Sequence, residues 1–203
     1  MAGLNLPILE LKPAQIALGI LEVEQKIEDY AHLSRDEFHA HSARHPVPVV
    51  KSDHGYYIID HYHLCRAYHE LGHRHVTLEL RADFSGLAPD RFWAALEAAH
   101  WVLPQDQFGV RHPYAHLPMD VRCMADDPYR SLVWRLKAAG AWHKAEVPFA
   151  EFQAANFLRP RVELGNTREA FELGLAAALR LLAALPAGAL AAVPGLAPPA
   201  ASP

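Results

Sequence analysis

Residues 56–72 constrain the fold of this chain more than any other stretch, because they contain a strand, a turn and a helix in direct succession. Residues 56–59 are aromatic or β-branched, which is typical of a strand. The apolar residues that follow recur at helical spacing, and Gly72 is a typical helix C-cap. Asp60 lies at the turn between the two elements, where we expect it to be the N-cap of the helix.

The first turn of this helix is a candidate anion site. It contains His61, Tyr62 and His63, and in a first turn the backbone N–H groups lack intrahelical partners and the helix dipole is positive. Phosphate binds readily at such places, and His63 would donate to a phosphate oxygen. Asp60 would orient a histidine or act as a base. The alternative is that Asp60 only caps the helix and that both histidines face solvent.

The composition is that of a folded domain with an acidic balance. The 203 residues are 51% hydrophobic, enough for a substantial core, and the formal net charge is −4. This charge argues against a dedicated nucleic-acid-binding protein, although a local basic groove is still open. Residues 1–13 show no signal peptide, and Pro186 and Gly188 interrupt the longest apolar stretch, residues 171–193. We therefore expect a cytoplasmic protein that does not associate with membranes.

Histidine is unusually frequent, with 14 residues, and several of them cluster in residues 39–45, 61–63 and 73–75. None of these clusters has the HExxH spacing or a zinc-finger spacing, so the sequence leaves a metal site unknown. The two cysteines, Cys65 and Cys123, form no CxxC pair, and we expect Cys65 to be a buried small apolar residue. The chain also lacks the GxSxG pattern of a serine nucleophile.

The remaining patterns predict strands and helices in the first half of the chain and helices in the second half. Strand patterns cover residues 6–11, 46–51, 56–59 and 75–82, with a hairpin turn at residues 52–55. Helical patterns cover residues 15–31, 35–43, 91–100, 128–137, 149–157 and 168–185. Ser34, Asp127 and Thr167 are the expected N-caps of three of these helices. Residues 186–203 are rich in Ala, Pro and Gly, and we expect them to be mobile.

Several sequence blocks occur in the same order as in a known family. They are the pattern of Leu11, Pro13, Gln15, Leu18, Gly19, Glu22, Val23 and Lys26, the run Pro-Val-Pro-Val-Val at residues 46–50, the box Asp-His-Tyr-His-Leu at residues 60–64, and the run Asp-Asp-Pro-Tyr-Arg-Ser-Leu at residues 126–132. Over residues 6–160 the chain resembles the putative ParB-like nucleases, a branch of the ParB/sulfiredoxin-like superfamily.

The resemblance implies an α+β fold, with a small mixed sheet flanked by helices and a helical C-terminal half. We expect a ParB/sulfiredoxin-like core in residues 1–86 and a helical extension packed on the core in residues 87–165. Residues 166–203 lie outside the resemblance, and we expect them to form an Ala/Leu-rich helix and a mobile Pro-rich tail.

In the superfamily, the box that opens the helix after Asp60 holds nucleotide phosphates. This chain departs from the superfamily pattern at Leu64, which takes the place of the phosphate-gripping arginine. It departs from the branch at Tyr62, which takes the place of the middle histidine. The reactive cysteine of sulfiredoxin would also fall at Tyr62, so the resemblance does not imply sulfiredoxin activity.

Relatives that phosphorylate free serine imply further roles. Their base is a glutamate near the first helix, which corresponds to Glu22 or Glu24. Lys26 would then neutralise phosphate charge, and Arg130 would supply the missing cation, with magnesium assisting the transfer. The alternatives are that Glu22 and Lys26 form only a solvated ion pair, and that Asp127 and Arg130 serve as a helix cap and a surface salt bridge.

We therefore predict that the protein binds a nucleotide or another phosphorylated ligand at the helix N-terminus after Asp60, for phosphoryl-transfer or phosphodiester chemistry with Mg²⁺. The candidate catalytic residues are Asp60, His61, His63 and Glu22, and the candidate phosphate-binding residues are His61, Tyr62, His63, Lys26 and Arg130. Three alternatives stay open: a nucleotide-sensing module without turnover, a DNA nuclease, which the acidic charge disfavours, and a histidine-based metal enzyme.

Overall fold

The computed structural model describes residues 4–199, and the chain divides into two compact units at the bond between Asp126 and Asp127. The first unit contains the β-sheets and four α-helices, and the second unit is helical. The predicted α+β fold, with a mixed sheet and a helical C-terminal part, is confirmed. The boundary between the units lies inside the helical extension that we expected over residues 87–165.

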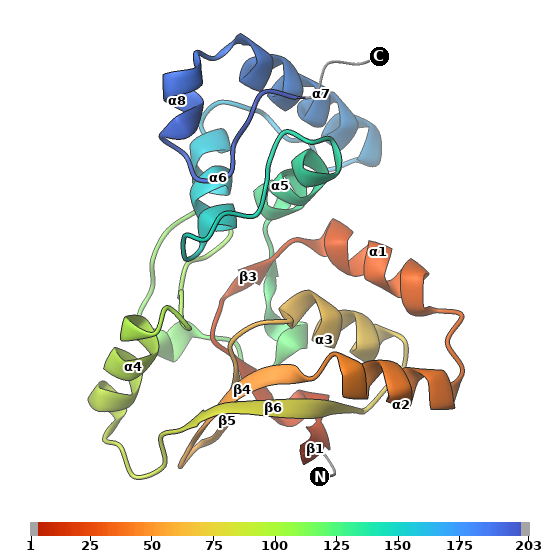
Figure 1. The fold of residues 1–203 in the computed structure, drawn as a ribbon, viewed down its shortest axis with the longest axis vertical. Helices are drawn as coiled ribbons and strands as arrows, with labels where there is room; N and C mark the ends of the chain where they lie inside the picture. Colours follow the sequence, from red (N-terminus) through yellow and green to blue (C-terminus); the bar gives the residue numbers. More distant parts are fainter. Residues whose placement is uncertain (1–3, 200–203) are drawn as a thin grey trace. The chain divides into compact units, whose positions relative to one another are not determined.

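A mixed five-stranded sheet forms the base of the first unit (Figure 1). Its strands, in spatial order, are β1 (Leu4–Pro7), β6 (His75–Asp83), β4 (Val47–Ser52), β5 (Gly55–Ile58) and β2 (Leu11–Pro13). The central pair β4 and β5 is antiparallel with Ser52 opposite Gly55, which confirms the predicted hairpin. β4 and β6 run parallel, as do β2 and β5, whereas β1 and β6 are antiparallel.

The start of the chain differs from the prediction in two places. The expected single strand over residues 6–11 is split by a short 3₁₀ helix, η1 (Ile8–Glu10), between β1 and β2. The expected helix over residues 15–31 begins only at Ile20, as α1 (Ile20–Tyr30). Residues 17–18 instead form a strand, β3, which pairs in parallel with β7 (Ala125–Asp126). That partner lies more than a hundred residues away, so no local pattern could reveal it.

The other helical elements of the first unit follow their sequence signals closely. They are α2 (Arg35–Arg44), α3 (Tyr62–Glu70) and α4 (Pro89–Ala98). The 3₁₀ turns η2 (Tyr114–His116) and η3 (Val121–Cys123) were not predicted from the sequence. The predicted capping box of α2 is present, since Ser34 accepts from the Glu37 N–H and Glu37 accepts from the Ser34 N–H.

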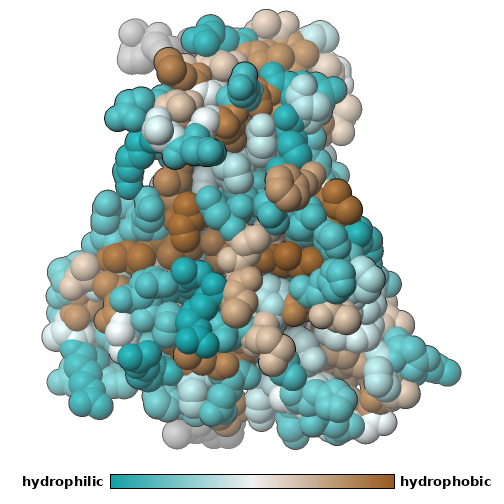
Figure 2. Space-filling view, turned by 180° about the vertical axis from the view of Figure 1, so that it is seen from behind, coloured by the Kyte–Doolittle hydropathy of each residue, from teal (hydrophilic) through white to brown (hydrophobic). Residues whose placement is uncertain are grey.

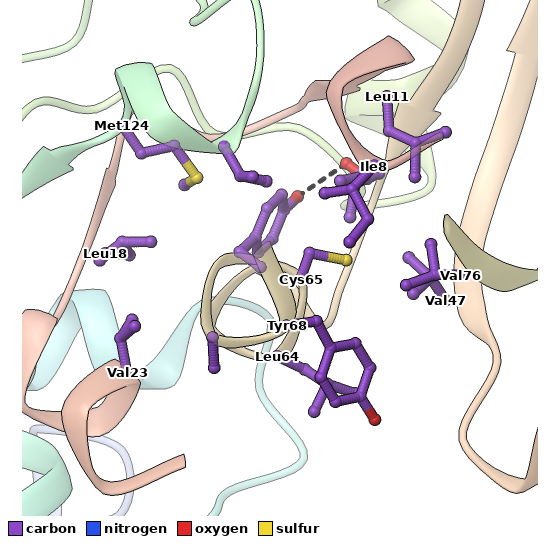
Figure 3. Packing of buried hydrophobic residues seen from close by; sticks show 14 of the residues in the cluster. Ile8, Leu11, Leu18, Val23, Val47, Leu64, Cys65, Tyr68, Val76 and Met124 are labelled. Atoms are coloured by element: carbon purple, nitrogen blue, oxygen red, sulfur yellow. Dashed lines mark hydrogen bonds between the residues drawn. The ribbon is translucent and has the colours of Figure 1, made fainter. Parts of the chain in front are cut away.

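The main core lies between one face of the sheet and helices α1, α2 and α3. Figure 3 shows Leu64, Cys65 and Tyr68 of α3 among side chains from the sheet side of the core, such as Ile8 and Val76. Cys65 is fully buried, as expected. α3 therefore has a fixed position, and its N-terminal turn is held at the end of strand β5.

The other face of the sheet is covered by α4. Phe92 and Leu96 of this helix pack against Val50 and Tyr57, whereas Val49 belongs to the core on the opposite face. Neighbouring residues of a strand point to opposite faces, which explains why β4 is buried on both sides. The centre of the sheet is thus buried on both faces, whereas β1 and β6 keep exposed residues such as Leu4 and Leu80.

The second unit consists of α5 (Pro128–Ala138), α6 (Ala150–Leu158), α7 (Arg168–Ala184) and α8 (Ala187–Ala191). Both predicted caps are confirmed: Asp127 accepts from the Tyr129 N–H, and Thr167 accepts from the Ala170 N–H. Asp127 is fully buried and also binds Arg159, whose Nη2 lies 2.9 Å from the Asp127 Oδ2.

The expectation of a mobile tail is wrong for residues 186–199. Leu190, Val193 and Leu196 are buried, and the Trp142 indole N–H donates to the Pro194 carbonyl over 3.1 Å. The chain turns at Gly195 with a φ of +82°, where a Cβ would lie only 2.2 Å from the His143 carbonyl oxygen. The apolar residues of the tail pack against the second unit. The Ala/Pro/Gly-rich composition of the tail did not indicate this packing. Residues 200–203 of the predicted tail lie outside the described residues.

Apolar residues are interspersed with hydrophilic ones on the surface that Figure 2 shows. Within residues 4–199, no helix combines the length and the hydrophobicity that crossing a membrane requires.

The two cysteines should react very differently with thiol reagents. Burial raises the pKa of the Cys65 thiol to about 12, whereas Cys123 is exposed. Because the thiolate is the reactive form, we expect Ellman's reagent to titrate only Cys123 in the folded protein and both thiols in guanidinium. The variant Cys123→Ser should show no fast reaction in the folded state, and a fast reaction there would contradict the burial of Cys65.

The buried pair of Asp127 and Arg159 should be important for stability. Replacing Asp127 with alanine removes the cap of α5 and leaves the guanidinium without its carboxylate, which typically costs about 3–5 kcal/mol. We expect urea denaturation to show a loss of this size for Asp127→Ala and a smaller loss for Asp127→Asn, which keeps a capping oxygen. A loss below about 1 kcal/mol for Asp127→Ala, within the range of an exposed pair, would contradict this role.

Candidate functional site

The corner between β5 and α3 has an unusual backbone. His61 precedes the helix with φ 64° and ψ 26°, the left-handed conformation, which is uncommon for a residue with a side chain. His61 rather than Asp60 occupies the N-cap position, so the expected Asp60 cap is wrong by one residue. Asp60 is exposed, and its Oδ1 accepts from the His61 N–H over 2.7 Å. The carboxylate thereby stabilises the left-handed turn instead of capping the helix.

Tyr62 anchors this corner to the core. Its side chain is only 4% exposed, and its hydroxyl donates to the Ile58 carbonyl over 3.0 Å, the bond drawn in Figure 3. This bond joins the first turn of α3 to the last residue of β5. The side chain of Tyr62 is therefore unavailable to a ligand, and the residue can offer only its backbone.

His63 connects α3 to the beginning of α1. Its Nε2 accepts from the Gly19 N–H over 3.1 Å, and its Nδ1 lies 3.6 Å from the Glu22 Oε2. Because Nε2 accepts a hydrogen bond, we assign the proton to Nδ1, which then points toward the carboxylate. The side chain is only 13% exposed, so His63 does not face solvent as the simpler interpretation of the sequence had it.

The structure brings Glu22, Lys26 and His63 into one row. The Lys26 Nζ lies 3.5 Å from the Glu22 Oε1, while the other carboxylate oxygen faces His63. The side chains of Glu22 and Lys26 are 25% and 27% exposed, so solvent reaches both of them. Three residues that were singled out from two separate sequence blocks are therefore neighbours at the first turn of α3.

His61 is partly buried at the same corner. Its Nδ1 is shielded from solvent and has no hydrogen-bond partner within residues 4–199. Burial lowers the pKa of His61, and the positive charge of Lys26 lowers it further, while the Asp60 carboxylate opposes this shift. The imidazole is therefore neutral at pH 7, with one ring nitrogen that a ligand or water would satisfy.

Two residues that the sequence analysis did not assign to the corner hold α1 against it. Gly19 is the N-cap of α1 and donates to His63, and Asp126 accepts from the Ile20 N–H over 3.0 Å. Asp126 reaches this position through the pairing of β3 with β7. The blocks at residues 11–26 and 126–132 contained both residues, but only the tertiary pairing gives them this role.

The remaining histidine clusters make aromatic contacts. The His41 Nδ1 lies 2.6 Å from the Tyr68 hydroxyl, and its ring stacks on His45 with the centroids 4.2 Å apart. His73 stacks on Phe38 with the ring centroids 3.3 Å apart. Among the residues that the structure describes, no group of three or more His, Cys, Asp or Glu side chains is placed to hold a metal ion.

Arg130, the predicted additional cation, belongs to the second unit. Its side chain is 7% exposed, and its guanidinium lies over the Phe152 ring, 3.9 Å from the centroid. Arg130 is therefore not a surface group. Its ionic contact, from Nη2 to the Glu151 Oε1, is long at 3.5 Å, so it is not the close surface salt bridge that the alternative predicted.

Comparisons with known proteins place this architecture in a family. Residues 4–160 match the family model described as "Putative ParB-like nuclease". The crystal structure of protein Atu1540 from Agrobacterium tumefaciens is similar, with a TM-score of 0.83 and 34% sequence identity over 95% of this chain and 96% of that chain. The search of curated proteins finds no match. The resemblance inferred from the sequence blocks is confirmed.

Three partly buried histidines predict a loss of stability in mild acid. Burial is the main cause that lowers the pKa values of His41, His61 and His73 in the folded protein. Below the unfolded pKa of about 6.5, the unfolded chain therefore binds more protons than the folded one. The free energy of unfolding should fall as the pH drops through this value toward the lower folded pKa values.

Thermal denaturation between pH 8 and pH 5.5 would measure this effect. We expect the melting temperature to fall on acidification, and to fall less steeply in the variant His61→Gln than in the wild type. The exposed His32 provides a matched control, and His32→Gln should keep the wild-type slope. Identical slopes for wild type and His61→Gln would show that the pKa of His61 is not lowered in the folded protein.

Proposed function

The chain belongs to the putative ParB-like nuclease family, and from this premise we propose that it binds a phosphorylated ligand, in particular a nucleotide, at the first turn of α3. The observation that carries the proposal is the row of Lys26, Glu22 and His63 beside the N-terminus of that helix. A cation, a carboxylate and a histidine at a helix N-terminus are the groups that phosphate chemistry uses.

The contacts of each residue suggest which role it would have in binding or catalysis. Lys26 would neutralise phosphate charge, and the partly buried His61 imidazole would donate to a ligand oxygen. His63 already accepts from Gly19 through Nε2, so its role would be to position α1 and Glu22. His63 is thereby changed from a catalytic candidate into a positioning residue.

Glu22 is the candidate base. Solvent reaches its carboxylate, and the His63 Nδ1 lies 3.6 Å from its Oε2. In a phosphoryl transfer, Glu22 would accept the proton of the attacking hydroxyl group as the new P–O bond forms. The bond from phosphorus to the leaving oxygen would break, and that oxygen would take the electron pair. With water as the nucleophile, the same base would support hydrolysis of a phosphodiester.

Magnesium would arrive with the nucleotide. Mg²⁺ is commonly held by one or two carboxylates together with substrate phosphates and water, and it supplies charge neutralisation during the transfer. Asp60 fits this arrangement because its carboxylate is exposed. Its Oδ1 accepts from the His61 N–H, so the ion would be held by Oδ2. Asp60 would therefore hold the ion, and residues 4–199 offer no complete protein cage for a metal.

The name of the family favours one second candidate, a nuclease, and we take DNA as its substrate. Its substrate would place a phosphodiester at the same corner. The formal net charge of −4 opposes strong binding to DNA. A nuclease would show DNA binding that weakens steeply as salt increases, together with release of nucleotides.

A thermal-shift panel of ATP, ADP, CTP, GTP and inorganic phosphate, each with and without Mg²⁺, tests the proposal. A ligand that binds only the folded state at a hundred times its dissociation constant stabilises the protein by about 2.7 kcal/mol. We expect a clear shift for at least one nucleotide and a smaller shift in Lys26→Met. The exposed Lys137 gives a control of equal charge, and Lys137→Met should respond as the wild type does.

Turnover separates an enzyme from a sensing module. Glu22→Gln should retain nucleotide binding but lose at least about a hundredfold in the rate of phosphate release or transfer, the usual contribution of a general base. Binding without turnover in the wild type would identify a sensing module instead. The absence of a thermal shift with every ligand would overturn the proposal for this corner.

A further inference from the structure

The second unit contains a buried cation, Arg130, whose guanidinium is only partly satisfied by its surroundings. Arg130 lies in the first turn of α5, and its side chain is 7% exposed. Its Nη1 is buried and has no hydrogen-bond partner in the described part of the chain. Its one ion pair is to Glu151, over 3.5 Å, and that carboxylate is itself 36% exposed. A buried guanidinium with an unused donor is costly unless an anion satisfies it.

The nearby carboxylate of Asp127 cannot compensate for Arg130, because it is already used. Asp127 caps α5 and is held by both terminal nitrogens of Arg159, at 2.9 and 3.3 Å. This arrangement is the two-pronged pairing in which a carboxylate and a guanidinium satisfy each other. Of these two carboxylates, Glu151 is therefore the one that pairs with Arg130.

Two helix N-termini add to the positive potential at Arg130. The residue lies in the first turn of α5, and its guanidinium contacts Glu151 and Phe152 in the first turn of α6. The two helices pack side by side in the second unit (Figure 1). α6 has no side-chain cap, since its N-cap residue is Phe149 in a left-handed conformation with φ 55°. A helix N-terminus attracts anions and repels cations, so both helices favour a negatively charged partner beside Arg130.

We propose that Arg130 and the first turn of α6 form an oxyanion site of the second unit, which takes a phosphate or a carboxylate group of a ligand. The Glu151 carboxylate, which is 36% exposed, would compete with the ligand for Arg130. Binding displaces this carboxylate, and the ligand oxygens pair with the guanidinium while the Phe152 ring supports its other face. The site does not depend on the function proposed for the α3 corner.

Glu151 provides the sharpest test, because a purely structural salt bridge and a ligand site predict opposite effects. Glu151→Gln keeps the size of the side chain and removes the competing negative charge. At an oxyanion site this change should strengthen anion binding about tenfold, since a like charge within a few ångströms repels the ligand. If Glu151 only pairs with Arg130 as a structural contact, the chain with Glu151 intact should bind neither anion, whereas a ligand site predicts measurable binding there that Glu151→Gln strengthens.

The measurement is isothermal titration calorimetry of the full chain with inorganic phosphate and, separately, with succinate, at pH 7.5 and constant ionic strength. All variants carry Lys26→Met as well, so that anion binding at the α3 corner is weakened to the same extent in each of them. We expect Glu151→Gln to tighten the binding of at least one anion, and the preferred anion identifies the ligand as a phosphate or a carboxylate. Adding Arg130→Met to Glu151→Gln should abolish the gain.

Arg161 provides a matched control on the same unit. It also stacks on an aromatic ring, that of Phe157 at 4.1 Å, but it is exposed and its Nη1 already donates to a carbonyl oxygen. Arg161→Met should leave anion binding unchanged. Circular dichroism would check that the Arg130 variants fold. The proposal is overturned if Glu151→Gln strengthens neither anion, or if the gain persists without Arg130.

Discussion

The burial of α3 is the constraint on which the candidate site depends. Leu64, Cys65 and Tyr68 hold the helix in the main core, and the Tyr62 hydroxyl ties its first turn to the last residue of β5. With both ends of the corner fixed, the chain must pass through His61 in a left-handed conformation. The buried packing around this turn stabilises its strained backbone. This turn also directs the first turn of α3 toward α1.

The second constraint is the hydrogen bond from Gly19 to His63. It fixes the start of α1 beside α3 and thereby sets where Glu22 and Lys26 stand. The pairing of β3 with β7 supports the same contact, since Asp126 accepts from the first N–H of α1. The proposed phosphate site and its candidate base are therefore positioned by rigid elements, which is what catalysis by positioning needs.

Local signals predicted the elements whose stabilising groups are close in sequence. The capping box at Ser34, the caps Asp127 and Thr167, and the hairpin between β4 and β5 each involve residues within a few positions of one another. Predictions failed where the partner is remote: the strand β3 needed β7, and the packed tail needed the contact of Pro194 with Trp142. Periodicity and composition contain no information about such partners.

The sequence by itself determined the α+β class, the family and the identity of the corner, because ordered blocks of residues specify these features. It also supplied Glu22, Lys26 and His63 as candidates, but from separate blocks and without their contacts. Only the tertiary structure decided that Tyr62 is buried, that His63 positions α1, and that Arg130 is a buried cation with an unused donor. Burial and hydrogen-bond partners arise from packing between distant segments, and these determine which polar groups are left for a ligand.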